Sequence, residues 1–211
     1  MTMASRELRN LFVIRPGEQF SPLNLSLEDE AFAAITFVVM PGASADILIN
    51  ADLKGSGAEV VVRGIYLCGG EEAVSVRTNI RHLVGDCRSS QLICGAVGGA
   101  AHTSFDGLVY VAQDAQKTEA FQTNRNILLS EEAKIETKPQ LEIYADDVKC
   151  SHGATVGRLS EDEQFYMRSR GIPEAEAKVL QTLSFLAPVL DGVPERESLL
   201  EQLECTIREI I

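Results

Sequence analysis

Short β-branched segments, cut by Gly, Asn, Asp or Pro at steady intervals, fill most of the first 159 residues and constrain the fold more than any other feature. The centres of successive segments are 13 to 17 residues apart, and no helical pattern of useful length interrupts them. Such a series fits a β-sandwich, an antiparallel barrel or a β-solenoid. The near-constant step favours a solenoid, in which each coil covers its neighbour. The predicted strands are residues 60–68, 73–83, 90–97, 105–113, 119–129, 134–145 and 148–156.

The segment 73–83 indicates which side chains face the interior. Its residues alternate as they do in a strand with one buried face. One face carries Val74, Val76, Thr78, Ile80 and His82, and the other carries Ser75, Arg77, Asn79 and Arg81. We therefore expect His82 to be a core residue with its polar atoms satisfied, and we interpret Cys87 in the same way.

The chain divides near residue 159. We expect residues 1–159 to form the solenoid, although the first 30 residues are hard to read beyond a short strand at Leu11–Ile14 and a turn at Pro16–Gly17. Residues 160–211 read as a small helical subdomain. Helices in that position can cover an open end of the solenoid, where backbone groups would otherwise be unpaired.

Three helices are predicted after residue 159. Ser160 and Glu163 form a capping box for the first, and Gly171 suits the position that closes it. Pro173 fits the first turn of the second helix, and a turn at Asp191–Gly192 follows it. The second helix carries the apolar stripe Ala175, Val179, Leu183 and Leu186, and the third, from about Pro194, carries Leu199, Leu203, Ile207 and Ile210.

The formal net charge of −12 argues against binding to nucleic acid or to anionic membranes, which both require clustered Lys and Arg. The longest apolar run, residues 31–40, is too short to cross a bilayer. The N-terminus lacks the apolar core of a secretory signal, so we expect a cytoplasmic protein. Its five cysteines show no CxxC spacing and should be thiols in a reducing compartment.

Cys150 and His152 are the candidate ligand pair. On an extended strand, residues i and i+2 point to the same face, about 7 Å apart. A thiolate and an imidazole placed in this way can both bind a soft metal or a cluster. The spacing alone favours the alternative that both residues fill the core. No arrangement of Ser, His and Asp suggests a nucleophile with its base, and no acidic pair resembles that of a glycosidase.

A specific resemblance covers residues 114–171, which read DAQKTEAFQTNRNILLSEEAKIETKPQLEIYADDVKCSHGATVGRLSEDEQFYMRSRGI. This run resembles the SufB/SufD family of iron–sulfur cluster assembly proteins, and within it SufD. Upstream, GIYLCGG at 64–70 and the pair His82 and Cys87 also fit the family's pattern. The resemblance implies a right-handed parallel β-helix followed by a C-terminal helical subdomain. Family members are usually about twice this length, so the chain reads as a short or partial member.

The resemblance also implies partners. It places the chain in a scaffold complex with SufB and the ABC-type ATPase SufC, where nascent clusters form near the interface between SufB and SufD. Cys150 and His152 match family positions near that interface, which favours an interface role as iron or cluster ligands over core filler. We expect no stably bound cofactor in this chain alone, and a dimer, with SufB or with a second copy, whose interface includes residues 140–156.

The resemblance implies that SufC docks on the C-terminal helices. Phe185 and Cys205 lie off the apolar stripes of their helices, so either a partner covers them or they pack against the solenoid. Two other classes remain open: a β-solenoid enzyme (polysaccharide lyase or acyltransferase) and a purely structural oligomerisation module. A lyase is disfavoured by the absence of Trp, and an acyltransferase by the absence of a six-residue repeat.

Overall fold

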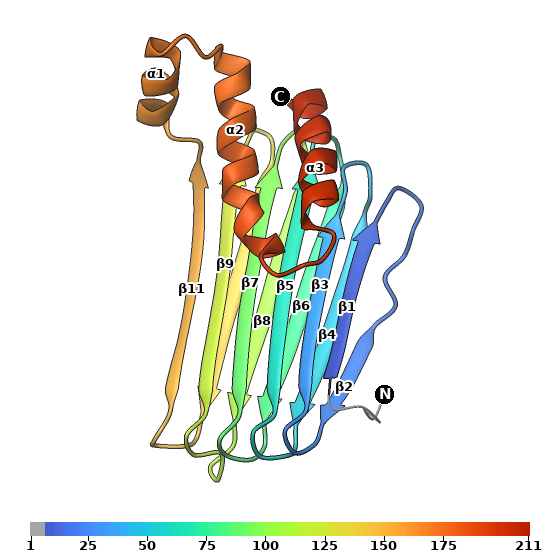
Figure 1. Ribbon diagram of the computed structural model, residues 1–211, viewed down its shortest axis with the longest axis vertical. Helices are drawn as coiled ribbons and strands as arrows, with labels where there is room; N and C mark the ends of the chain where they lie inside the picture. The colour runs from blue at the N-terminus through green and yellow to red at the C-terminus, as the bar shows by residue number, and fades with distance from the viewer. Residues whose placement is uncertain (1–6) are drawn as a thin grey trace.

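The computed structural model describes residues 7–211 (Figure 1). The part from residue 7 to residue 158 consists of strands joined by short turns. The strands are β1 Glu7–Ile14, β2 Leu23–Leu27, β3 Phe32–Val39, β4 Ala45–Leu53, β5 Glu59–Cys68, β6 Ala73–His82, β7 Arg88–Val97, β8 His102–Val111, β9 Glu119–Leu128, β10 Lys134–Ile143 and β11 Lys149–Arg158.

The strands form two facing parallel sheets. Odd-numbered strands make a six-stranded sheet in the order β1-β3-β5-β7-β9-β11, and even-numbered strands make a five-stranded sheet in the order β10-β8-β6-β4-β2. After each strand the chain crosses to the other sheet, and after the next strand it returns to the first sheet beside the strand it left (Figure 1). This is a parallel β-solenoid, as predicted. Strands β1 and β2 lie in the region that was hard to read; the predicted strand at Leu11–Ile14 is the second half of β1.

The interior follows from the alternation of side chains along each strand. On β6, the predicted inward set is buried and its neighbours are more exposed. The first coils are filled by aliphatic residues, including Ile35, Ile47, Ile49 and Val62. Glycines make room for aromatic rings: Phe37 of β3 lies over Gly64 of β5, where an added Cβ would meet the ring at 2.1 Å.

Three α-helices and a short 3₁₀ helix follow the last strand: α1 Glu161–Ser169, α2 Glu174–Leu186, η1 Ala187–Leu190 and α3 Arg196–Ile210. Figure 1 shows α2 and α3 lying across the outer face of the six-stranded sheet, with α1 beyond the end of β11. Leu199, Leu203 and Ile207 of α3 share one apolar cluster with Ile65 and Leu67 of β5. These helices thus cover a flank of the solenoid rather than its open end.

The start of α1 and the face of α3 confirm the sequence analysis. Ser160 accepts a hydrogen bond from the backbone N–H of Glu163 at 3.3 Å, and Gly171 has φ +88°. The predicted stripe of α2 is partly wrong, because Ala175 is exposed while Ala177 and Thr182 are buried. The neighbouring sheet and α3, rather than the helix's own apolar pattern, decide which face of α2 is covered.

Phe185 resolves one of the two alternatives left open by the sequence. It is half-buried against the same apolar cluster, and the guanidinium of Arg125 lies 5.1 Å from its ring centroid. It therefore packs against the solenoid and is not a free contact for a partner. Cys205 is exposed.

Candidate ligand site on the terminal strand

Strand β11 carries the candidate pair and lies at the edge of its sheet. It pairs with β9 along its whole length, and within residues 7–211 no strand pairs with its other side. Its side chains are also poorly covered: every residue from Lys149 to Arg158 is exposed except Cys150, which is half-buried. The terminal coil is the least covered part of the solenoid.

Cys150 and His152 point to the same face of β11. Cys150 is in register with Ala120 of β9, and His152 is in register with Gln122. Because Ala120 and Gln122 are buried in the solenoid, the pair lies on the inward face of the last coil. Cys150 rests on a small apolar cluster that includes Val109 and Ala120, whereas His152 is exposed.

The surroundings keep the Cys150 thiol protonated at neutral pH. Partial burial raises its pKa, and a backbone hydrogen bond with Ala120 opposes this only in part. An ion pair between Lys149 and Glu119, at 2.9 Å, lies beside the site. The thiol becomes a ligand by giving up its proton when it meets a metal ion or cluster, so its affinity for metal rises with pH.

The donor set of this chain is incomplete for a metal centre. Among the described residues, no group of three or more His, Cys, Asp or Glu side chains could hold a metal ion. Iron–sulfur clusters are held by several protein ligands, mainly Cys thiolates with His as a substitute. Cys150 and His152 could supply two ligands, and a second chain or a small molecule would have to supply the others.

The other cysteines and His82 are poor ligand candidates. His82 is fully buried, its Nε2 lies 2.8 Å from the Ser89 hydroxyl, and burial lowers its pKa to about 4. Cys87 is buried and donates to the backbone oxygen of Gly55 at 3.2 Å. Both residues lie in the core as predicted, but the expectation that all polar atoms of His82 are satisfied is wrong, because its Nδ1 has no partner among the described residues. Burial raises the pKa of Cys68 to about 12 and that of Cys94 to about 11.

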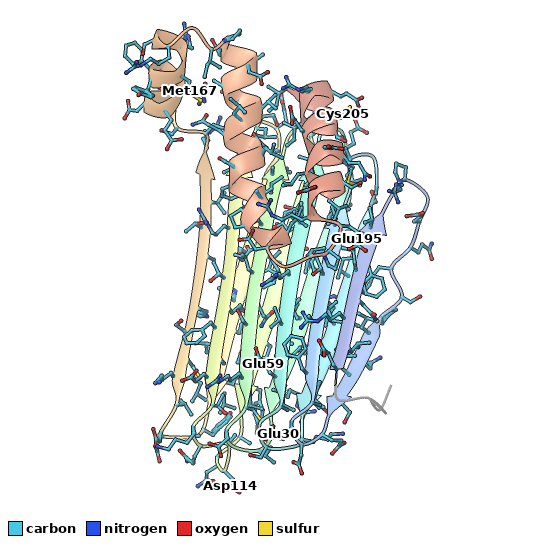
Figure 2. The ribbon with its side chains drawn as sticks, in the orientation of Figure 1. Glu30, Glu59, Asp114, Met167, Glu195 and Cys205 are labelled. Atoms are coloured by element: carbon cyan, nitrogen blue, oxygen red, sulfur yellow. The ribbon has the colours of Figure 1, made fainter. Side chains whose placement is uncertain are left out.

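Two exposed apolar surfaces were missed by the sequence analysis. The first is spread along the terminal coil, where Ile143 and Tyr144 are exposed beside the turn before β11 and Val156 is exposed near the far end of β11. The second lies on α1, in which no residue is buried and Phe165 and Tyr166 are 73% and 60% exposed. Met167 of α1 and Cys205 of α3 mark the helical end of the molecule, and Asp114 marks the opposite end (Figure 2). The sequence did contain a signal for the second surface: consecutive large apolar residues on a predicted helix.

The fold and the site together define a class: a parallel β-solenoid with helices on one flank and an incomplete ligand pair on its open terminal strand. The chain belongs to the SufBD family of the SUF system for iron–sulfur cluster assembly, because the model of the SufBD core domain matches residues 19–185. None of the helices in the described part of the chain is both long and apolar enough to cross a lipid bilayer.

Several relatives agree with this assignment. The chain is 37% identical to the iron–sulfur cluster assembly protein SufD of Escherichia coli over 187 residues, which are 89% of this chain and 44% of that protein. It is 34% identical to SufD of Bacillus subtilis over 68% of this chain and 33% of that protein. A SufBD family protein of Synechocystis is 51% identical over 94 residues. The chain therefore spans less than half the length of the relatives it matches.

Proposed function

We propose that this chain acts as a SufD-type subunit of an iron–sulfur cluster assembly scaffold and that it is not a free-standing enzyme. The observation that carries the proposal is the position of half-buried Cys150 and exposed His152, which form a two-donor set on the open terminal strand. A set with two ligands is suited to an interface where a partner completes the coordination. The nascent cluster is then cargo of the complex and not a resident cofactor of this chain.

The partner that completes the site is SufB or a second copy of this chain. An uncovered edge strand is a template for pairing with another chain. In addition, Ile143 and Val156 leave apolar side chains 38% and 45% exposed on the terminal coil. A solenoid seated on this coil would bury both residues and bring its own donors next to Cys150 and His152.

The SufC-type ATPase would bind at the other end of β11, on the C-terminal helices. A shallow groove between α1 and α2 is lined by Tyr166, Met167 and Leu180. The eight residue-to-residue steps from Cys150 to Arg158 span about 26 Å of extended strand. An ATPase bound in this groove would therefore act on the ligand pair through movement of the subunit rather than from within the groove itself.

The test is anaerobic reconstitution with iron and sulfide of the chain co-expressed and co-purified with SufB and SufC from the same organism. Cys150→Ser and His152→Ala are expected to leave the complex intact and to lower its bound iron and sulfide several-fold. Cys205→Ser, which removes an exposed thiol on α3, is the matched control and should have no effect. If both variants assemble and load as much cluster as the wild type, the chain is a structural module instead.

A further inference from the structure

The interior of the solenoid changes character along its axis. In the coils up to β5, the inward residues are almost all aliphatic or aromatic. From β6 onward, polar side chains replace many of them at inward positions that remain buried. These residues are Thr78, His82, Ser89, Gln91, Thr103, Gln122, Asn124 and Asn126. Polar groups are costly in a dry core unless each finds a hydrogen-bond partner.

The two asparagines find partners within the protein. Asn124 donates to the backbone oxygen of Ile93 at 3.3 Å. Asn126 donates to the side-chain oxygen of Asn124 at 2.7 Å and accepts from the hydroxyl of Tyr66. This end of the polar interior therefore forms a closed hydrogen-bond network.

The two buried glutamines, in contrast, leave polar atoms without a hydrogen-bond partner. Gln91 accepts from the Thr78 hydroxyl at 2.7 Å, but its Nε2 has no partner among the described residues. Nε2 and Oε1 of Gln122 also have no hydrogen-bond partner among the described residues, although Gln122 is only 1% exposed. The Thr103 hydroxyl and Nδ1 of His82 are likewise buried without a partner.

Two of these groups, the side chains of Gln91 and Gln122, lie in a row that leads to the open coil. Gln91, Gln122 and His152 are in register on β7, β9 and β11, so they stack along the axis about 4.8 Å apart. Val62 of β5 is in register with Gln91 on its other side, so the polar row ends there. The amide of Gln122 reaches across the interior, since a Cβ added to Gly107 of the facing sheet would lie 2.5 Å from its Nε2.

A second row runs beside the first. Ser89, Ala120 and Cys150 are in register on the same three strands. Ser89 is the partner of His82, and the small side chain of Ala120 separates Ser89 from Cys150. The two rows together join the exposed His152 to the buried pair of His82 and Ser89.

We propose that ordered water molecules bind along this row and form a chain that extends from His152 past Gln122 and Gln91 to His82. Buried water that meets otherwise unpartnered polar groups is a regular part of protein structure. The site favours neutral ligands, because no inward-facing buried residue from β6 to β9 is a Lys, Arg, Asp or Glu, and burial keeps His82 uncharged at neutral pH. This inference does not depend on the proposed function.

The test measures contacts between solvent water and the side chains directly, by NMR on the isotopically labelled full chain. Cross-relaxation peaks from water are expected to the side-chain amide protons of Gln91 and Gln122 and to the ring of His82. Gln122→Met keeps the length of the side chain and removes both unpartnered atoms. In this variant, the peaks at Gln91 and His82 should be lost, and the ratio of folded to unfolded protein should fall about tenfold.

Gln19→Met, which replaces an exposed glutamine, is the control and should change neither readout. A dry interior predicts the opposite pattern: no water peaks in the wild type, and a Gln122→Met variant that is more stable than the wild type because two unpaired polar atoms are gone. Should Gln122→Met fail to fold, the wild-type spectrum decides alone, since absent water peaks at Gln91, Gln122 and His82 would overturn the proposal.

Discussion

The hydroxyl of Tyr66 on β5 donates a hydrogen bond to the side-chain oxygen of Asn126 on β9, across the intervening strand β7. Tyr66, Gly95 and Asn126 are in register on these three strands. The bond is possible because Gly95, the residue between them, has no side chain: a Cβ there would lie 1.9 Å from the Tyr66 ring and 2.5 Å from Oδ1 of Asn126. Two coils of the solenoid are thus joined through the space that one glycine leaves.

Gly95→Ala is therefore expected to destabilise the protein by about 3 kcal/mol. Overpacking a rigid core costs roughly 1–3 kcal/mol, and displacing the ring would also break a buried hydrogen bond at a cost of about 1 kcal/mol. Urea denaturation followed by circular dichroism measures the difference. Gly153→Ala on β11 is the control, because nothing lies within 4 Å of its added Cβ. Equal stability of the two variants would refute the bridge.

Glu72 links the turns of two coils through hydrogen bonds. Its carboxylate accepts hydrogen bonds from the backbone N–H groups of Gly42 at 2.7 Å, Gly69 at 3.2 Å and Gly70 at 2.7 Å. Burial alone would raise the pKa of Glu72, but these donors outweigh it, and the pKa of the folded protein is lowered. The carboxylate therefore contributes stability above the unfolded-state pKa of about 4.5, and this is lost as the pH falls through the lower folded-state value.

Glu72→Gln is expected to cost about 1–3 kcal/mol at pH 7. The loss should shrink as the pH falls from 4.5 through the lower folded-state pKa, below which the folded wild type is also protonated at Glu72. Thermal unfolding followed between pH 7 and the onset of acid denaturation measures both effects. The neighbouring Glu71 is exposed, so Glu71→Gln should behave as the wild type. A constant difference between wild type and Glu72→Gln at every pH would contradict this account.

The strands of the solenoid were readable from sequence because each coil repeats the same local pattern. Inward positions such as Val74, Val76 and Ile80 alternate with outward ones, and turn residues separate the segments. Strands β2, β3 and β4 were not delimited in advance, because they precede the regular series that begins at residue 60, and β2 has only five residues. The face of α2 could not be predicted from its own sequence, since the packing of the sheet and α3 determines it.

The candidate site was only partly predictable. The spacing of Cys150 and His152 showed that they share a face, but it could not distinguish the core from an open edge. That distinction depends on β11 being paired on one side only, which is a property of the whole sheet. The buried amides were visible as Gln122, Asn124 and Asn126 at alternate positions of one strand, yet which of their atoms lack partners depends on the facing sheet.

Leu203→Ala on α3 tests whether the helices and the solenoid unfold as one unit. Leu203 is fully buried in the cluster that joins α3 to β5, so its truncation is expected to cost about 2–5 kcal/mol. Glu201→Ala, at an exposed position one half-turn away, should change the stability by less than about 0.5 kcal/mol. Circular dichroism at helix and strand wavelengths should give coincident transitions in both variants. Separate transitions would show that the helices unfold independently.

The last prediction concerns the exposed surface of α1. Phe165→Ser and Tyr166→Ser remove large aromatic side chains that are mostly exposed, so neither variant should lose more than about 0.5 kcal/mol of stability. If the SufC-type ATPase docks there, exposed aromatic residues would be its main anchors, and at least one variant should weaken binding by about 2 kcal/mol, or roughly thirtyfold. Isothermal titration calorimetry with the purified ATPase measures this.

Phe121→Ser is the control for that experiment, because Phe121 is also an exposed aromatic residue, 44% accessible, but lies near the start of β9, at the end of the strands opposite α1. The control is expected to bind the ATPase as the wild type does, since its side chain is distant from the groove between α1 and α2. Undiminished binding by both α1 variants would show that the ATPase docks elsewhere. Equal weakening by Phe121→Ser would show that the loss of affinity is not specific to α1.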